Sequence, residues 1–156
     1  MTSDRERISR MRSIILSSLS YFGIVILSGF VLGIVRVFWL APWLGERNAE
    51  LLEMPIMLFV AYVSAGYVIK RFRLPDVKAA CTVGVVALIL LLALEFTLVL
   101  ELRGLSVEEY LRSRDPISSA AYAFSLLVYG ALPGILKFVR ERSAPLNSRK
   151  PEKPGR

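Results

Sequence analysis

The sequence predicts an all-α integral membrane protein, a bundle of four transmembrane helices with both termini in the cytoplasm. Of its 156 residues, 54% are hydrophobic. These residues are concentrated in four runs of about twenty apolar residues, the length that crosses a bilayer. Within each run they surround the segment and form neither an alternating pattern nor a single stripe, as expected for helices in contact with lipid.

The first predicted span covers residues 14–40. Basic residues precede it, as they do in a signal peptide. The apolar run is too long for the hydrophobic region of a signal peptide, however, and no small-residue cleavage pattern follows it. We therefore expect a retained helix, with Trp39 and Trp43 marking the far interface.

The other three predicted spans cover residues 51–69, 79–100 and 116–136. If the second helix began at Pro55, fifteen residues would remain before Lys70, or about 22 Å at 1.5 Å per residue. This length is short of the roughly 30 Å hydrocarbon core of a bilayer. We therefore expect the helix to begin near Glu46 and to bend at the proline.

Two further segments have their own predictions. Between the third and fourth spans, Ser106 and Glu109 form an S-x-x-E capping pattern beside apolar residues that share one face. This pattern predicts a short amphipathic helix in the second outer loop, on the membrane surface. Residues 1–140 then form the transmembrane domain, and residues 141–156 form a basic cytoplasmic tail that we expect to be disordered.

The positions of the basic residues predict the orientation. Fifteen Lys and Arg residues lie in the N-terminal segment, the middle loop and the C-terminal tail, whereas five lie on the opposite side of the membrane. Because loops rich in Lys and Arg stay in the cytoplasm, both termini are expected there. The net charge of +7 follows from these residues and from contact with anionic lipids, so we expect membrane lipids as partners and no nucleic acid.

Polar residues of the outer half of the bundle are the candidate site. The candidates are Arg36, Glu53, Glu95, Asp115, Ser118 and Tyr122. A charge at the centre of a span costs about 2.5–3.5 kcal/mol, so Arg36 and Glu95 need an explanation. Three interpretations stay open: the two charges neutralise each other and fix the helix register, the candidates form a polar pocket for an ion, a proton or a lipid headgroup, or the charged side chains extend to the interface.

Small residues four positions apart predict where the helices approach each other closely. The candidates for these packing faces are Gly29, Gly33, Ala61, Ala65, Gly130 and Gly134. Such small residues let the backbones of neighbouring membrane helices come near each other.

Several kinds of chemistry are not indicated by the sequence. Cys81 is the only cysteine and there is no histidine, which excludes an intramolecular disulfide, a thiol pair and imidazole ligation of haem or metal. The sequence has no phosphate-binding loop, no serine-hydrolase motif and no zinc-protease motif. We therefore expect no cofactor, no metal and no catalysis.

Three stretches carry a resemblance to a known group of proteins. They are RVFWLAP at residues 36–42, ELLEMP at residues 50–55 and RDP at residues 114–116. With them, residues 14–140 resemble a group of small, uncharacterised four-helix proteins of the bacterial inner membrane. The resemblance implies that membrane but supplies no activity and no functional residues. The chain differs from small multidrug exporters, whose first helix has an essential acid, because Arg36 is the charged residue there.

Three functional hypotheses follow. The first is a protein that acts by association with a membrane protein or with itself, as an accessory subunit, assembly factor or modulator. The second is a small oligomeric proton- or ion-coupled transporter that uses Glu95. The third is a lipid-handling protein that uses the charged outer loop.

Overall fold

The computed structural model describes residues 2–103 and 116–143, and every regular element in these ranges is a helix. The elements are α1 (Thr2–Val35), the π-helical turn η1 (Arg36–Leu40), α2 (Ala41–Leu44), α3 (Glu46–Arg71), α4 (Val77–Arg103) and α6 (Pro116–Ser143). Four helical segments are long and apolar enough to cross a membrane, namely Arg7–Leu44, Glu46–Arg71, Val77–Leu98 and Ser119–Ser143. The predicted fold class is thereby confirmed at the level of an all-α architecture with four such helices.

Two predicted features cannot be placed in the described part of the chain. The amphipathic helix expected in the second outer loop and the tail after residue 143 lie outside the described residues. The helices themselves extend beyond the predicted spans: α6, for example, continues to Ser143 rather than ending near residue 136. These extensions carry charged residues, such as Arg140 and Arg142 in the last turn of α6.

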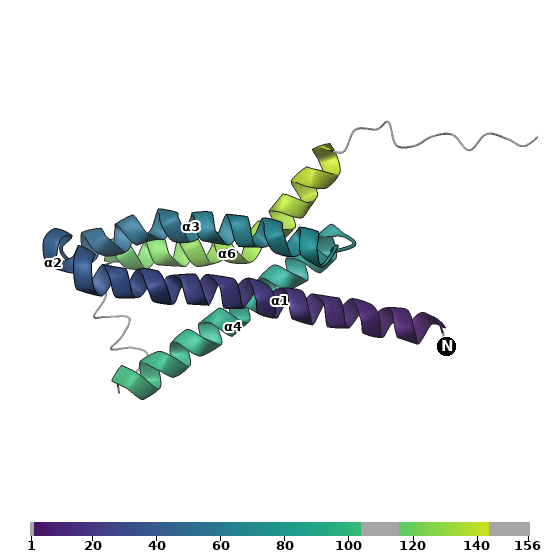
Figure 1. Cartoon of the computed structure of the whole chain (residues 1–156), viewed down its shortest axis with the longest axis horizontal. Helices are drawn as coiled ribbons and strands as arrows, with labels where there is room; N and C mark the ends of the chain where they lie inside the picture. The colour runs from purple at the N-terminus through teal and green to yellow at the C-terminus, as the bar shows by residue number, and fades with distance from the viewer. Residues whose placement is uncertain (1, 104–115, 144–156) are drawn as a thin grey trace, which may run out of the picture.

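The four long helices are arranged so that α1 and α6 each pack against both α3 and α4 (Figure 1). The N-terminus, the loop from α3 to α4 and the C-terminal end of α6 lie toward one end of the molecule, and α2 lies at the other (Figure 1). We call the part of the bundle near the chain ends the terminal half. The part that contains η1, α2 and the start of α3 is called the hairpin half.

The π-helical turn η1 leads from α1 into the chain reversal before α3. Pro42 has no amide hydrogen and its ring disfavours a normal α-helical turn before it. The Ala41 amide donates instead to the carbonyl of Arg36, five residues back, which widens the helix into η1. The chain then reverses at Gly45, whose φ of 79° and ψ of 156° are essentially restricted to glycine.

The helix α3 begins at Glu46 and contains Pro55, as the span length predicts. The proline lies two turns or more into the helix and removes one amide donor there. The alternative start at Pro55 is wrong, because the residues before it are already helical. This early start brings the acidic residues at the beginning of α3 alongside the end of α1.

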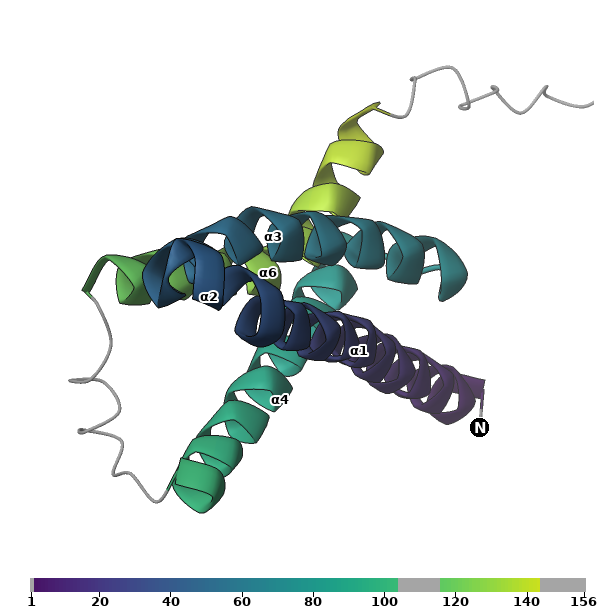
Figure 2. The ribbon, with the colours of Figure 1, turned by 60° about the vertical axis from the view of Figure 1, so that its left-hand side comes forward.

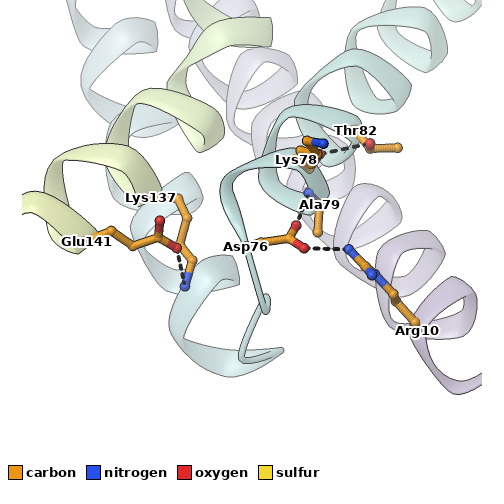
Figure 3. A network of polar contacts seen from close by, with 7 residues as sticks. All are labelled: Arg10, Asp76, Lys78, Ala79, Thr82, Lys137 and Glu141. Carbon is orange, nitrogen blue, oxygen red and sulfur yellow. Dashed lines mark hydrogen bonds and ion pairs between the residues drawn. The ribbon is translucent and has the colours of Figure 1, made fainter. Parts of the chain in front are cut away.

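The loop between α3 and α4 is fixed by Asp76 (Figure 3). Its Oδ1 accepts a hydrogen bond of 2.7 Å from the Ala79 amide, which caps the N-terminus of α4. Its Oδ2 is 2.6 Å from the Nη2 of Arg10, which ties this cap to α1. The Ala79 amide and, secondarily, the Arg10 guanidinium lower the pKa of Asp76, so its carboxylate is ionised at neutral pH.

The buried core lies in the terminal half and is made largely of small residues; Ala49, at the start of α3, is buried outside it. The core comprises Ser17, Ser18, Tyr21 and Val25 of α1, Ala61, Ser64, Ala65, Val68 and Ile69 of α3, Leu74 of the following loop, Ala79, Ala80, Val83, Gly84 and Ala87 of α4, and Tyr129, Gly130, Pro133 and Gly134 of α6. The hydroxyls of Ser17 and Ser18 donate to carbonyls one turn back in α1. They therefore enter the core without an unsatisfied hydrogen-bond donor.

The tightest helix contact is the crossing of α4 and α6. A Cβ atom at Gly84 would overlap the carbonyl oxygen of Gly130, and one at Gly134 would lie against the sulfur of Cys81. Beyond this crossing α4 diverges from α3 and α6 toward its C-terminal end (Figures 1 and 2). No described residue of α4 after Ala87 is fully buried, so the bundle is closed in the terminal half and open in the hairpin half.

A proline in α6 explains the hydrogen bond between α1 and α6. Pro133 has no amide hydrogen, so the carbonyl of Tyr129, four residues earlier, loses its normal donor within the helix. The hydroxyl of Tyr21 donates to this carbonyl at 2.9 Å. The two tyrosine rings stack with their centroids 4.7 Å apart. A neighbouring helix thus satisfies the backbone group that the proline leaves free.

This arrangement predicts the effect of removing the Tyr21 hydroxyl. Tyr21→Phe is expected to destabilise the protein by about 1–3 kcal/mol, because the Tyr129 carbonyl becomes a buried acceptor without a donor. In a Pro133→Ala background the loss is expected to be much smaller, because alanine has the amide donor that proline lacks. Thermal unfolding in detergent of the two single variants, the double variant and the parent measures this coupling.

Tyr62→Phe, at an exposed tyrosine of α3, is the matched control and should change stability little. Equal losses from Tyr21→Phe with and without Pro133 would show that the carbonyl is not the reason.

Candidate functional site: a cavity in the hairpin half

A cavity of about 250 Å³ lies between α1, α3 and α6, with one side chain from α4. It is lined by Val25, Ile26, Gly29, Arg36, Glu50, Glu53, Met54, Met57, Leu58, Ala61, Leu91, Tyr122, Ser125, Leu126 and Tyr129. The cavity reaches from Arg36, where η1 begins, to Val25 at the edge of the core. These residues are roughly 16 Å apart along the helix at 1.5 Å per residue. The cavity therefore connects the charged end of the hairpin half with the closed core.

Arg36 bridges α1 and α3 through two ion pairs. Its Nη1 lies 3.2 Å from Glu50 Oε1, and its Nε lies 3.3 Å from Glu53 Oε2. The three side chains are 15–30% exposed, so most of their surface is covered by other parts of the protein. One guanidinium therefore faces two acidic side chains in the cavity wall.

The two carboxylates are held differently. Glu50 accepts a hydrogen bond from Arg36. Glu53 Oε2, although close to the guanidinium, lies outside hydrogen-bond geometry and is buried without a directed donor. Glu53 is thus the carboxylate of this pair that keeps capacity for a further donor.

Glu95 reaches the cavity wall indirectly. Its Oε2 accepts a hydrogen bond from the hydroxyl of Tyr122, which lines the cavity from α6. The ion pairs of Arg36 are made with the two acids of α3, which disagrees with the one of the three interpretations in which Arg36 and Glu95 neutralise each other. The reason is the early start of α3, which brings two carboxylates nearer to Arg36 than the diverging α4 brings Glu95.

The hydroxyl side chains of α6 follow the cavity toward the core. Ser125 donates to the Ala121 carbonyl within its own helix. Tyr129 is 4% exposed, and its hydroxyl has no hydrogen-bond partner among the described residues. Ser118 lies in the first turn of α6 and its side chain is not described, and Asp115 lies outside the described residues.

The predicted packing residues have different surroundings. Ala61, Ala65, Gly130 and Gly134 are buried in the terminal half. Gly29 lies against the methyl group of Met57 at the cavity, whereas a Cβ at Gly33 would meet nothing within 4 Å. Gly29 therefore lines the cavity, and the Gly29–Gly33 pair does not form a close helix contact at both positions.

One charged residue of the site was not a candidate from the sequence. Glu50 lies three positions before Glu53 and thus on the same face of a helix that begins at Glu46. The three-residue spacing indicates that Glu50 and Glu53 share a face. It does not indicate that this face meets Arg36, because that depends on the turn at Gly45.

No protein-family model, no curated protein and no solved structure matches this chain. The resemblance to four-helix proteins of the bacterial inner membrane therefore stays a prediction. The site is interpreted from its own geometry: a largely apolar cavity with one guanidinium and two acidic side chains at one end and the buried residue Tyr129 at the other.

The geometry predicts that Arg36 is needed to hold the two acids together. Arg36→Met is expected to destabilise the protein by roughly 1–3 kcal/mol, because two neighbouring carboxylates lose their counter-charge. Removing one partner of a fully buried pair costs about 3–5 kcal/mol, and this pair is partly exposed. Adding Glu50→Gln and Glu53→Gln should restore most of the loss. Thermal unfolding in detergent measures both, and a loss that persists in the triple variant would contradict the ion-pair explanation.

Proposed function

We propose that this protein is a non-catalytic membrane protein that acts by association, as an accessory subunit, assembly factor or modulator. The observation that carries the proposal is the divergence of α4 from the bundle after its crossing with α6 (Figure 2). In the terminal half the helices pack closely against one another through small residues. In the hairpin half the outer part of α4 lacks that packing among the described residues.

The position of Glu95 strengthens this proposal. Lipid chains can cover exposed apolar residues such as Phe96, so exposure alone requires no protein partner. An acid within a membrane helix is different, because it is costly unless it faces protein or water. Glu95 and Tyr122 span the diverging helices, and a partner helix packed beside them would complete their shielding from lipid. The partner that we propose is a transmembrane helix, either of another protein or of a second copy of this chain, packed beside Glu95 and Tyr122.

A second function is favoured by one observation. The cavity wall carries two acidic side chains beside Arg36, and the hydroxyl of the lining residue Tyr122 donates a hydrogen bond to a third acid, Glu95. Such a set of groups is typical of proton or ion pathways in membranes. We keep proton- or ion-coupled transport through Glu95 as the alternative.

We also propose that the terminal half faces the cytoplasm of a bacterial cell and that the protein lies in the inner membrane. The basic residues Arg10, Lys70, Arg71 and Arg73 belong to the end of the bundle that holds the N-terminal segment, the end of α3 and the C-terminal end of α6, which agrees with the positive-inside rule. A C-terminal green fluorescent protein fusion should fluoresce, and a C-terminal alkaline phosphatase fusion should be inactive. The opposite pair of results would reverse the orientation.

Site-specific photo-crosslinking tests the association. A benzoylphenylalanine at Phe96, on the diverging part of α4, is expected to crosslink to one protein species in native membranes. The same probe at Phe59, which is 66% exposed on α3, is the control and should crosslink mainly to lipid. A band at twice the monomer mass would identify a second copy as the partner.

Two results would contradict the association. One is lipid-only crosslinking at Phe96. The other is proton or ion flux by the purified protein alone in liposomes that Glu95→Gln abolishes, because this result would favour transport instead.

A further inference from the structure

We propose that the C-terminal end of α6, together with the end of α3, binds an anionic phospholipid, with Arg140 and Lys70 on its phosphate. This site lies in the terminal half, away from the cavity, and it does not rest on the association surface of α4. Four observations carry the inference: the direction in which α6 ends, its exposed apolar face, the position of the Arg140 guanidinium and the excess of basic side chains around it.

The last turns of α6 leave the bundle. Beyond its crossing with α4 the helix passes α3, and its C-terminal end points away from the other helices (Figures 1 and 2). Ile135 precedes Phe138 and Val139 by three and four positions, so the three side chains share one face of the helix. They are 45–52% exposed. This part of α6 therefore carries an apolar face that the other described helices leave about half uncovered.

The contact between α6 and α3 places this end of α6 near a membrane surface. Arg140 lies against Gly66 of α3, where an added Cβ atom would be 3.3 Å from Nη2 of the arginine. The helix α3 ends at Arg71, five residues or about 8 Å beyond Gly66. In a membrane that α3 spans, this depth is close to the boundary between acyl chains and headgroups. Amphipathic helices bind at that boundary with their apolar face toward the chains.

The guanidinium of Arg140 is held in position but is not paired. Because Gly66 has no side chain, the guanidinium lies directly on α3, and it forms no hydrogen bond or ion pair with a described residue. Arg140 is partly exposed, and none of its side-chain nitrogens is fully buried. Lys70 lies one turn after Gly66 on the same face of α3 and is exposed. A guanidinium and an ammonium on neighbouring helices are suitable donors for one phosphate.

Basic side chains outnumber acidic ones around this site. Residues 70–78 and 137–143 contain seven Lys or Arg residues and two acids. Each acid already contacts a basic residue, Asp76 with Arg10 and Glu141 with Lys137 (Figure 3). The acids of these two segments thus leave Arg140 and Lys70 without a counter-charge, which a phosphate would supply.

The apolar face decides which anion fits. The guanidinium of Arg142 lies over the ring of Phe138, 4.5 Å from its centroid, so a cation adjoins the exposed apolar face. A soluble anion such as a nucleic acid would neutralise the cations but would leave that face in water. A phospholipid satisfies both features, because its phosphate meets the cations while its acyl chains cover the apolar side chains.

Native mass spectrometry of the delipidated full chain in detergent tests the site with two lipids that share their acyl chains. Dioleoyl phosphatidylglycerol is expected to bind saturably, and the zwitterionic dioleoyl phosphatidylcholine about tenfold more weakly. Glycerol phosphate and a DNA oligonucleotide, each at the same phosphate concentration as the lipid, should not displace phosphatidylglycerol. Equal binding of the two lipids, or displacement by either soluble anion, would overturn the proposal.

Four variants locate the binding. Arg140→Gln and Lys70→Gln are each expected to weaken binding of phosphatidylglycerol roughly fivefold. Arg140→Lys keeps the charge without the planar fork and should bind with intermediate affinity. Lys70 is exposed, so its variant should fold as well as the parent.

Arg7→Gln is the matched control, because it removes the same charge from an exposed position of α1 outside the proposed site. It should bind phosphatidylglycerol with parental affinity. Equal weakening by Arg7→Gln and the two site variants would show a general effect of net charge and overturn the site. Parental affinity in both Arg140→Gln and Lys70→Gln would overturn it as well.

Discussion

The close crossing of α4 and α6 at Gly84 and Gly130 is the contact on which the rest of this structure depends. No side chain larger than hydrogen fits between the two backbones there. Helices that touch so closely at one point and cross at an angle must separate on either side of it. The crossing lies in the terminal half, so the separation opens the hairpin half, where lipid or protein must replace the missing helix contacts.

Pro133 links the closed core to the open half. Its buried ring packs near Gly84, and its missing amide frees the carbonyl of Tyr129 for the hydroxyl of Tyr21. That hydrogen bond and the stack of the two tyrosine rings hold Tyr129 at the edge of the cavity. Tyr129 therefore belongs both to the buried core and to the wall of the cavity.

The charged side chains of the hairpin half lie around Arg36, at the start of the π-helical turn η1. A guanidinium within a membrane helix is costly, and two carboxylates of α3 offset that cost by direct pairing. The structure also separates the two acidic regions: Glu50 and Glu53 belong to the hairpin, while Glu95 is held by Tyr122 across the diverging helices.

Length and hydropathy by themselves determined the helices, because a run of about twenty apolar residues has few stable conformations outside a membrane helix. The same local reasoning placed the start of α3 at Glu46 and identified Arg36, Glu53, Glu95 and Tyr122 as polar residues that needed partners. Those residues were found singly, each on its own helix.

Their pairing was decided only by the tertiary structure. Which acid meets Arg36 depends on the single-residue turn at Gly45 and on the angle at which α4 leaves α6, and both arise from contacts between segments far apart in the chain. The sequence pattern shows that Gly84 and Gly130 are small, but not that they face each other. The cavity and the pairing of Arg36 with two acids likewise lie between helices, so they depend on how the helices pack and not on any single segment.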